Sequence, residues 1–118
     1  MNIKQFLEDY GRHPLASGMD DIVLSGKNGQ KFALKNILGS AVAVYIAYTF
    51  QKNTDNTFVV VCDDDEKAAY LYSDLNNLIE NKEVLLLPQS YRKPFKVSDI
   101  DNNNVLKRAE VISRLSAH

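Results

Sequence analysis

The feature that most constrains the fold is a run of β-branched residues placed before an amphipathic segment. Residues 57–62 read TFVVVC, a continuous apolar run that is typical of a central strand in a parallel sheet, because such a strand is buried on both faces. The next segment, DDDEKAAYLYSDLNNLIENK, begins with acidic residues and continues with apolar residues at helical spacing, which predicts a helix. The run EVLLLP, which Pro88 closes, predicts another strand. The chain therefore alternates strands with helices here.

The N-terminal part predicts a helix and a pair of entry strands. Residues 3–10 have apolar side chains at helical spacing, and we expect this helix to end at Gly11 and Pro14. Asn-Gly at positions 28–29 stands between the apolar residues 22–24 and 32–34. This pattern predicts a small hairpin or two short strands joined by a tight turn.

Two further helices complete the order of elements. Ser40 is the expected N-cap of a buried helix that runs to about Gln51, since that segment is apolar on every side. A polar segment follows Pro88, and we expect the last helix to begin near Asn104. The order β-α-β-α-β-loop-α predicts an α/β fold with three layers, a parallel sheet with helices on both faces. Ligands of such sheets bind at the carboxyl ends of the strands.

Length and composition bound the domain organisation and the classes of function. The 118 residues suit effectively one domain. Within it, residues 1–30 are expected to form the N-terminal helix and entry strands, and residues 31–118 the sheet lobe. Because three core strands make a thin sheet, we expect an incomplete lobe of a larger protein. The net charge of −1 excludes a generally basic surface that would bind nucleic acid nonspecifically.

The cysteine and histidine content argues against disulfides and metal. Cys62 stands alone, so it is expected to be a buried strand residue in a reducing compartment. His13 and His118 have no cysteine-rich neighbourhood, so no metal site is predicted. No apolar stretch reaches about 18 residues, and the polar N-terminus does not read as a signal peptide. We therefore expect a cytoplasmic protein without membrane contact.

The segment KNILGSAVAVYIAYTF, residues 35–50, has the outline of a phosphate-binding loop that has lost its chemistry. A working loop reads G-x-x-x-x-G-K-[ST], in which the glycines admit phosphate, the lysine reaches it and the hydroxyl holds Mg²⁺. Here all four of these positions are replaced, and a Gly-Ser turn at a helix start remains. The relict loop consists of Asn36, Gly39, Ser40, Ala41, Val42 and Ala43. Without the lysine we expect no ATP hydrolysis. A nucleotide sensor that holds phosphate through the Gly39-Ser40 turn is the alternative.

The order of motifs resembles a known family. The stretches FVVVCDDDEKAAYLYSDLNNLI and LLLPQSYRKPFKVSDIDNNNVLKRAEVISRL resemble the N-terminal UvrB-like region of the bacterial transcription-repair coupling factor (Mfd), over residues 31–115. AAYLYSDL resembles the helicase motif Ia helix. The pattern LP-x-x-Y-x-x-P-[YF] falls on Leu87, Pro88, Tyr91, Pro94 and Phe95, and residues 108–115 follow the family pattern.

The resemblance implies a role in transcription-coupled nucleotide excision repair. It implies a degenerate RecA-like lobe that is a non-catalytic scaffold, with no catalytic residue and no cofactor in this chain. In that family the full protein displaces stalled RNA polymerase from DNA and recruits UvrA. ATP and Mg would be bound only by C-terminal motor lobes, beyond this chain. The expected partners are UvrA through the wider UvrB-like module, DNA and RNA polymerase for the full protein, and other domains of the parent.

Two segments bear on nucleic-acid binding. The acidic residues Asp63, Asp64, Asp65 and Glu66 would repel phosphate, and we interpret them first as a helix start that suits the helix dipole. The loop SYRKPFK interleaves basic and aromatic residues, which can meet phosphates and stack on bases. Its candidate residues are Tyr91, Arg92, Lys93, Phe95 and Lys96. We interpret this loop first as an ordinary solvated loop, and DNA binding through residues 91–96 as the alternative.

Overall fold

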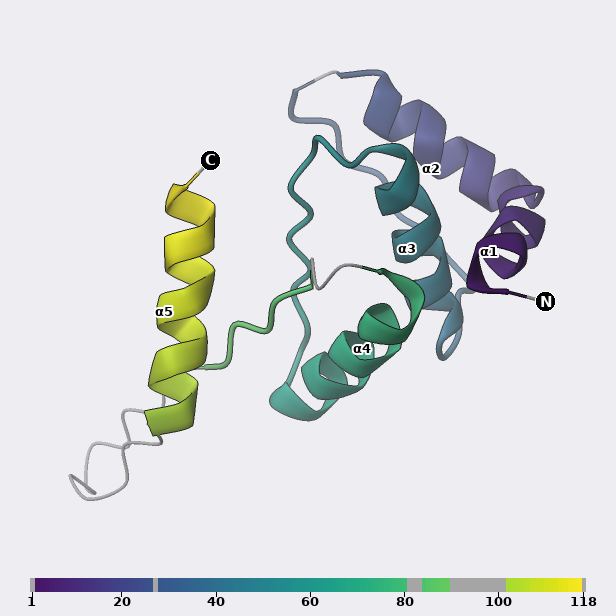
Figure 1. The fold of residues 1–118 in the computed structure, drawn as a ribbon. Coiled ribbons are helices and arrows are strands. Elements are labelled where there is room, and N and C mark those ends of the chain that lie inside the picture. The colour runs from purple at the N-terminus through teal and green to yellow at the C-terminus, as the bar shows by residue number, and fades with distance from the viewer. Residues whose placement is uncertain (1, 27, 81–83, 90–101, 118) are drawn as a thin grey trace.

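Helices are the regular secondary structure of the residues that the structure describes. The computed structural model describes residues 2–26, 28–80, 84–89 and 102–117, and within these ranges it has five helices and no strand (Figure 1). The helices are α1 (Ile3–Gly11), α2 (Pro14–Leu24), α3 (Ala41–Lys52), α4 (Asp65–Leu78) and α5 (Asn102–Ser116).

The predicted α/β fold with a parallel sheet is therefore wrong for the described residues. The runs 57–62 and 84–88 have no secondary structure, although both were predicted as strands. A strand needs a partner for its backbone N–H and C=O groups, and residues 57–62 form no hydrogen bond with any described residue. Val59 and Val61 remain 79% and 88% exposed, so this run is not a buried central strand.

The predicted entry hairpin also needs correction. Residues 22–24 are the last turn of α2 rather than a strand. Pro14 was expected to end the first helix, but it opens the second, where proline is favoured because the first amides of a helix have no acceptor. The ring nitrogen Nδ1 of His13 caps α2 by accepting from the Leu15 amide at 3.2 Å.

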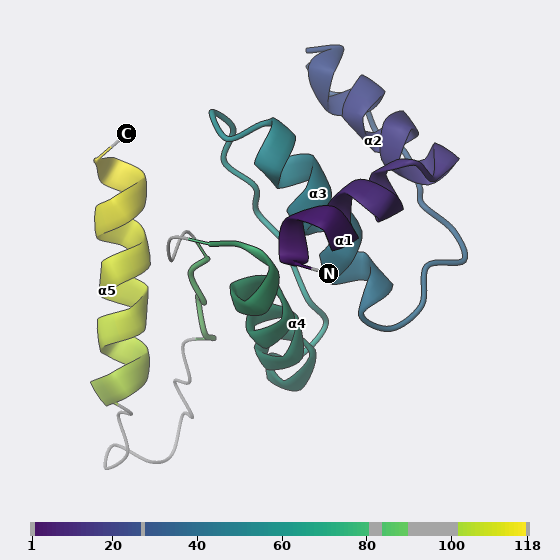
Figure 2. The same cartoon turned by 45° about the vertical axis from the view of Figure 1, so that its right-hand side comes forward.

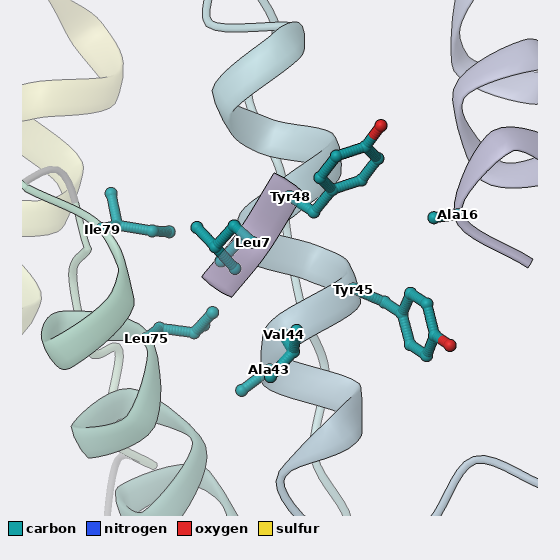
Figure 3. Packing of buried hydrophobic residues seen from close by; sticks show 9 residues of the cluster. Leu7, Ala16, Ala43, Val44, Tyr45, Tyr48, Leu75 and Ile79 are labelled. Atoms are coloured by element: carbon teal, nitrogen blue, oxygen red, sulfur yellow. The ribbon is translucent and has the colours of Figure 1, made fainter. Parts of the chain in front are cut away.

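The helix α3 is the centre of the core. It packs against α1, α2 and α4, which surround it in Figures 1 and 2. Ala43 and Ala47 are fully buried on α3, and their small side chains let the neighbouring helices approach closely. Figure 3 shows Leu7 of α1 and Leu75 of α4 near each other beside α3, in the same buried cluster. Helices on both sides of α3 in the chain therefore depend on it for the burial of their apolar residues.

The helix α5 stands apart from this core. Figures 1 and 2 both show a space between α5 and the group α1–α4, and Val111 is its one buried residue among those described. The guanidinium Nη1 of Arg108 donates to the Pro88 carbonyl at 2.7 Å, which ties α5 to the segment that follows α4.

Candidate functional site

The relict phosphate loop is folded as an ordinary helix start. Gly39 has a φ of 57° and Asn36 a φ of 63°, so both adopt the left-handed conformation. The amides of Ala41 and Val42 donate to the carbonyls of Leu38 and Gly39 at 3.3 and 3.4 Å. A phosphate at this turn would need backbone amides that are directed outward and have no other acceptor. The amides of Ala41 and Val42 already donate to backbone carbonyls.

The positions that hold the lysine and the hydroxyl in a working loop differ in burial here. Val42, at the lysine position, is 37% exposed, whereas Ala43, at the hydroxyl position, is fully buried in the core. A side chain at position 43 is therefore directed into packed protein and away from any ligand at the turn. The Ser40 hydroxyl, expected as the N-cap, makes no capping hydrogen bond.

The acidic segment before α4 has a structural role, as the first interpretation predicted. The Asp64 carboxylate caps α4 by accepting from the Lys67 amide at 2.7 Å, and Asp65 and Glu66 lie in the first turn. The Lys67 ammonium donates to Asp63 at 2.6 Å, and this hydrogen bond lowers the pKa of the Asp63 carboxyl. Among the described residues no group of three metal-binding side chains is present.

The candidate nucleic-acid loop cannot be compared with its prediction. Its residues Tyr91, Arg92, Lys93, Phe95 and Lys96 lie outside the described ranges. DNA binding through this loop stays a prediction.

An open cleft lies between α4 and α5 in the described part of the chain. It has a volume of about 360 Å³ and continues, through Leu86, into a smaller hollow of about 180 Å³. α4 forms one wall, α5 the other, and the extended segment after α4 the floor. The residues that line the larger part are Tyr72, Asn76, Val84, Leu85, Leu86, Lys107, Glu110 and Val111.

The chemistry of this cleft suits a mixed apolar and polar surface. Val84 and Leu86 supply an apolar floor, and Lys107 and Glu110 place opposite charges on the α5 wall. The amide Nδ2 of Asn76 is already engaged, since it donates to the Tyr72 carbonyl at 2.9 Å. Such a lining can bind an amphipathic segment of protein, and it lacks the convergent basic groups that a phosphate needs.

The outer face of α5 extends this surface. Val105, Leu106, Ile112 and Leu115 are each more than half exposed. Large apolar side chains gathered on one helix indicate an interaction surface rather than scattered surface residues. The sequence predicted this helix, with its start within two residues of the observed Asn102.

A polar cluster joins α2 to α3, and no sequence motif pointed to it. The Lys52 ammonium donates to Asp20 Oδ2 at 3.1 Å and lies 4.5 Å from the centroid of the Tyr48 ring. Its hydrogen bond with Tyr48, and then the one with Asp20, raises the pKa of Lys52. Asp20 Oδ1 and Thr49 Oγ1 are buried without a partner among the described residues. The cluster holds α2 and α3 together.

Comparison with known proteins identified no relative: no protein family, curated protein or solved structure matched the chain. None of the helices in the described ranges has the length and apolar character needed to cross a membrane.

Proposed function

We propose that this chain is a non-catalytic interaction module, and that it works in transcription-coupled nucleotide excision repair as part of a transcription-repair coupling factor. The observation that carries the interaction role is the surface formed by the cleft and the outer face of α5. The repair role rests on the motif order of residues 31–115, described above. This role does not require the parallel sheet that was predicted from the sequence.

The α5 surface supports binding to a protein. Interface energy is concentrated in a few large side chains that become buried on binding. Val105, Ile112 and Leu115 are available for this purpose, because each is more than half exposed.

The turn at Gly39 supports a role without nucleotide chemistry. Val42 replaces the lysine that would contact phosphate, and the position of the Mg²⁺ ligand is Ala43, which lies in the core. Changing position 43 to threonine would add volume to packed protein, so a working site cannot be restored by the two motif residues alone.

The test is a titration of the chain into UvrA and, separately, into RNA polymerase, followed by calorimetry. Binding to one of them is expected, and the double change Val105→Asp with Ile112→Asp should weaken it by about tenfold or more. The matched control is Leu24→Asp on α2, an equally apolar residue that is 71% exposed and far from the cleft. Failure of both partners to bind would overturn the proposal.

A parallel titration with Mg-ATP and Mg-ADP tests the nucleotide-sensing alternative. No binding is expected for the parent chain, and Val42→Lys alone should not create a site, because the Ala41 and Val42 amides are engaged. Micromolar binding of ATP by the parent would instead favour the sensor.

A further inference from the structure

The extended segment 57–62 is an unpaired edge on the surface of the protein. Its side chains alternate, since Phe58 is partly buried and packs on Phe50 with ring centroids 5.5 Å apart, whereas Val59 and Val61 are among the most exposed apolar residues. The backbone of this segment forms no hydrogen bond with the described residues. A β-branched stretch with free N–H and C=O groups is a template for the addition of another extended chain.

A second extended segment has complementary chemistry. Residues 31–35 read KFALK, with Phe32 and Leu34 exposed and a lysine at each end. This segment too forms no hydrogen bond with the described residues. The edge 57–62, in contrast, is followed directly by the acidic residues 63–66. One segment is therefore apolar and basic, and the other is apolar and acidic.

We infer that segment 31–35 of one copy of the chain pairs with edge 57–62 of a second copy, so that the protein associates with itself. This inference goes beyond the proposed repair role and uses a different surface. In Figures 1 and 2 the two segments run past α3 on different sides, with 57–62 on the side toward α5. In this conformation the two segments of one chain cannot pair with each other, but each can pair with a segment of a second copy.

The spacing of apolar residues fits this pairing in either strand direction. Val59 and Val61 are two positions apart, as are Phe32 and Leu34, so both pairs stand on one face of an extended ladder. A parallel arrangement places Val59 opposite Phe32, and an antiparallel one places it opposite Leu34. Cross-strand pairs of aromatic and β-branched residues are stabilising.

The charges fit in either direction as well. With the apolar pairs aligned, Lys35 falls opposite Cys62 in the parallel arrangement and Lys31 does so in the antiparallel one. The residue next to Cys62 is Asp63, whose side chain is 83% exposed. One lysine of the added segment therefore always lies beside the acidic residues. Pairing of edge 57–62 with itself would lack this complementarity.

The contact joins two different surfaces, so it is heterologous, and successive copies can add at both ends. We expect the average mass measured by sedimentation velocity to rise continuously from micromolar to millimolar chain, beyond the mass of a dimer. Val59→Asp with Val61→Asp should raise the dissociation constant by about tenfold or more. Both side chains are exposed, so circular dichroism should show an unchanged helix content.

Three controls make the result specific. Leu106→Asp changes an apolar residue of α5 that is 68% exposed, and it should leave association unaltered. Lys31→Glu with Lys35→Glu should weaken association, and adding Asp63→Lys to that chain should restore part of it. A synthetic peptide of sequence QKFALKN, residues 30–36, should occupy the edge and lower the average mass.

Two results would overturn the inference. One is a monomer mass at every concentration. The other is association that Val59→Asp with Val61→Asp leaves intact or that Leu106→Asp weakens equally. Because UvrA binding is proposed to use α5, a failure of self-association leaves the titration with UvrA unaffected, and the two proposals can be separated.

Discussion

At the scale of single residues, the contact between Gly11 and Tyr48 is the most sensitive to substitution. A Cβ at position 11 would lie 2.2 Å from Cε2 of Tyr48. That ring is 8% exposed and carries Lys52 on its face, so it has little room to move. We expect Gly11→Ala to lower the free energy of unfolding by about 1–3 kcal/mol, measured by urea denaturation.

Gly18 is the matched control for this substitution. It lies inside α2, and a Cβ there would meet no atom within 4 Å. Gly18→Ala should raise the free energy of unfolding by roughly 0.5–1 kcal/mol, because alanine loses less backbone freedom in a helix. Equal effects of the two substitutions would show that Tyr48 does not restrict position 11.

Lys52 makes a pH-dependent contribution to stability. Its hydrogen bonds raise its pKa above the ordinary value of 10.5 in the folded chain. The contribution is therefore fully present below pH 10.5 and is lost as the pH rises through the raised pKa. Because half of the side chain is exposed, the contribution is screened and small.

The comparison that checks this is the parent against Lys52→Met, which keeps the apolar stem. We expect the difference in their free energies of unfolding to be constant at neutral pH and to shrink above pH 10.5. Using the difference removes the titration of the tyrosines, which both chains share. A difference that grows with pH would contradict the ion pair with Asp20.

At the scale of elements, two helix starts that look alike in sequence differ in the structure. Asp64 accepts a hydrogen bond from an amide in the first turn of α4, whereas Ser40 makes no such bond at α3. Asp64→Ala should therefore cost about 1 kcal/mol of unfolding free energy, and Ser40→Ala close to nothing. Urea denaturation measures both, and Asp64→Asn, which keeps an acceptor, should retain most of the stability.

Local signals explain which elements could be predicted from the sequence. The helix at residues 3–10, the acidic start of α4 and the last helix follow from spacing and capping within a few residues, and all three were correct within two or three residues. α2 was missed because Pro14 was expected to end the first helix and the Asn-Gly turn to join two strands, whereas Pro14 starts a helix that runs to Leu24.

The strands were wrong for a different reason. A β-branched run such as 57–62 indicates a local preference for strand structure, but the structure forms no strand there. Pairing, however, depends on another segment far away in the sequence. The sequence of residues 57–62 does not show whether a pairing partner lies beside this segment in the fold. The cleft could not be predicted from the sequence for the same reason. It is formed where α5 lies near Tyr72 of α4, and the two helices are far apart in the chain.

At the scale of the whole molecule, α5 should be less stable than the central helix α3. It buries Val111, whereas six residues of α3 are buried. Local opening costs least where few apolar contacts are lost. We expect the amides of α5 to exchange with deuterium at least about tenfold faster than those of α3, measured by mass spectrometry of peptic fragments. Similar protection of both helices would show that α5 is docked onto the core.

The place of α3 in the chain has a consequence for synthesis on the ribosome. α1 and α2 leave the ribosome first, but the surface that covers Leu7 and Ala16 is supplied by α3, which follows them. At about 5–20 residues per second, the apolar faces of α1 and α2 wait on the order of seconds before Tyr48 and Lys52 emerge. During that interval the nascent chain is a natural client for chaperones at the ribosomal exit, and the completion of α3 ends its exposure.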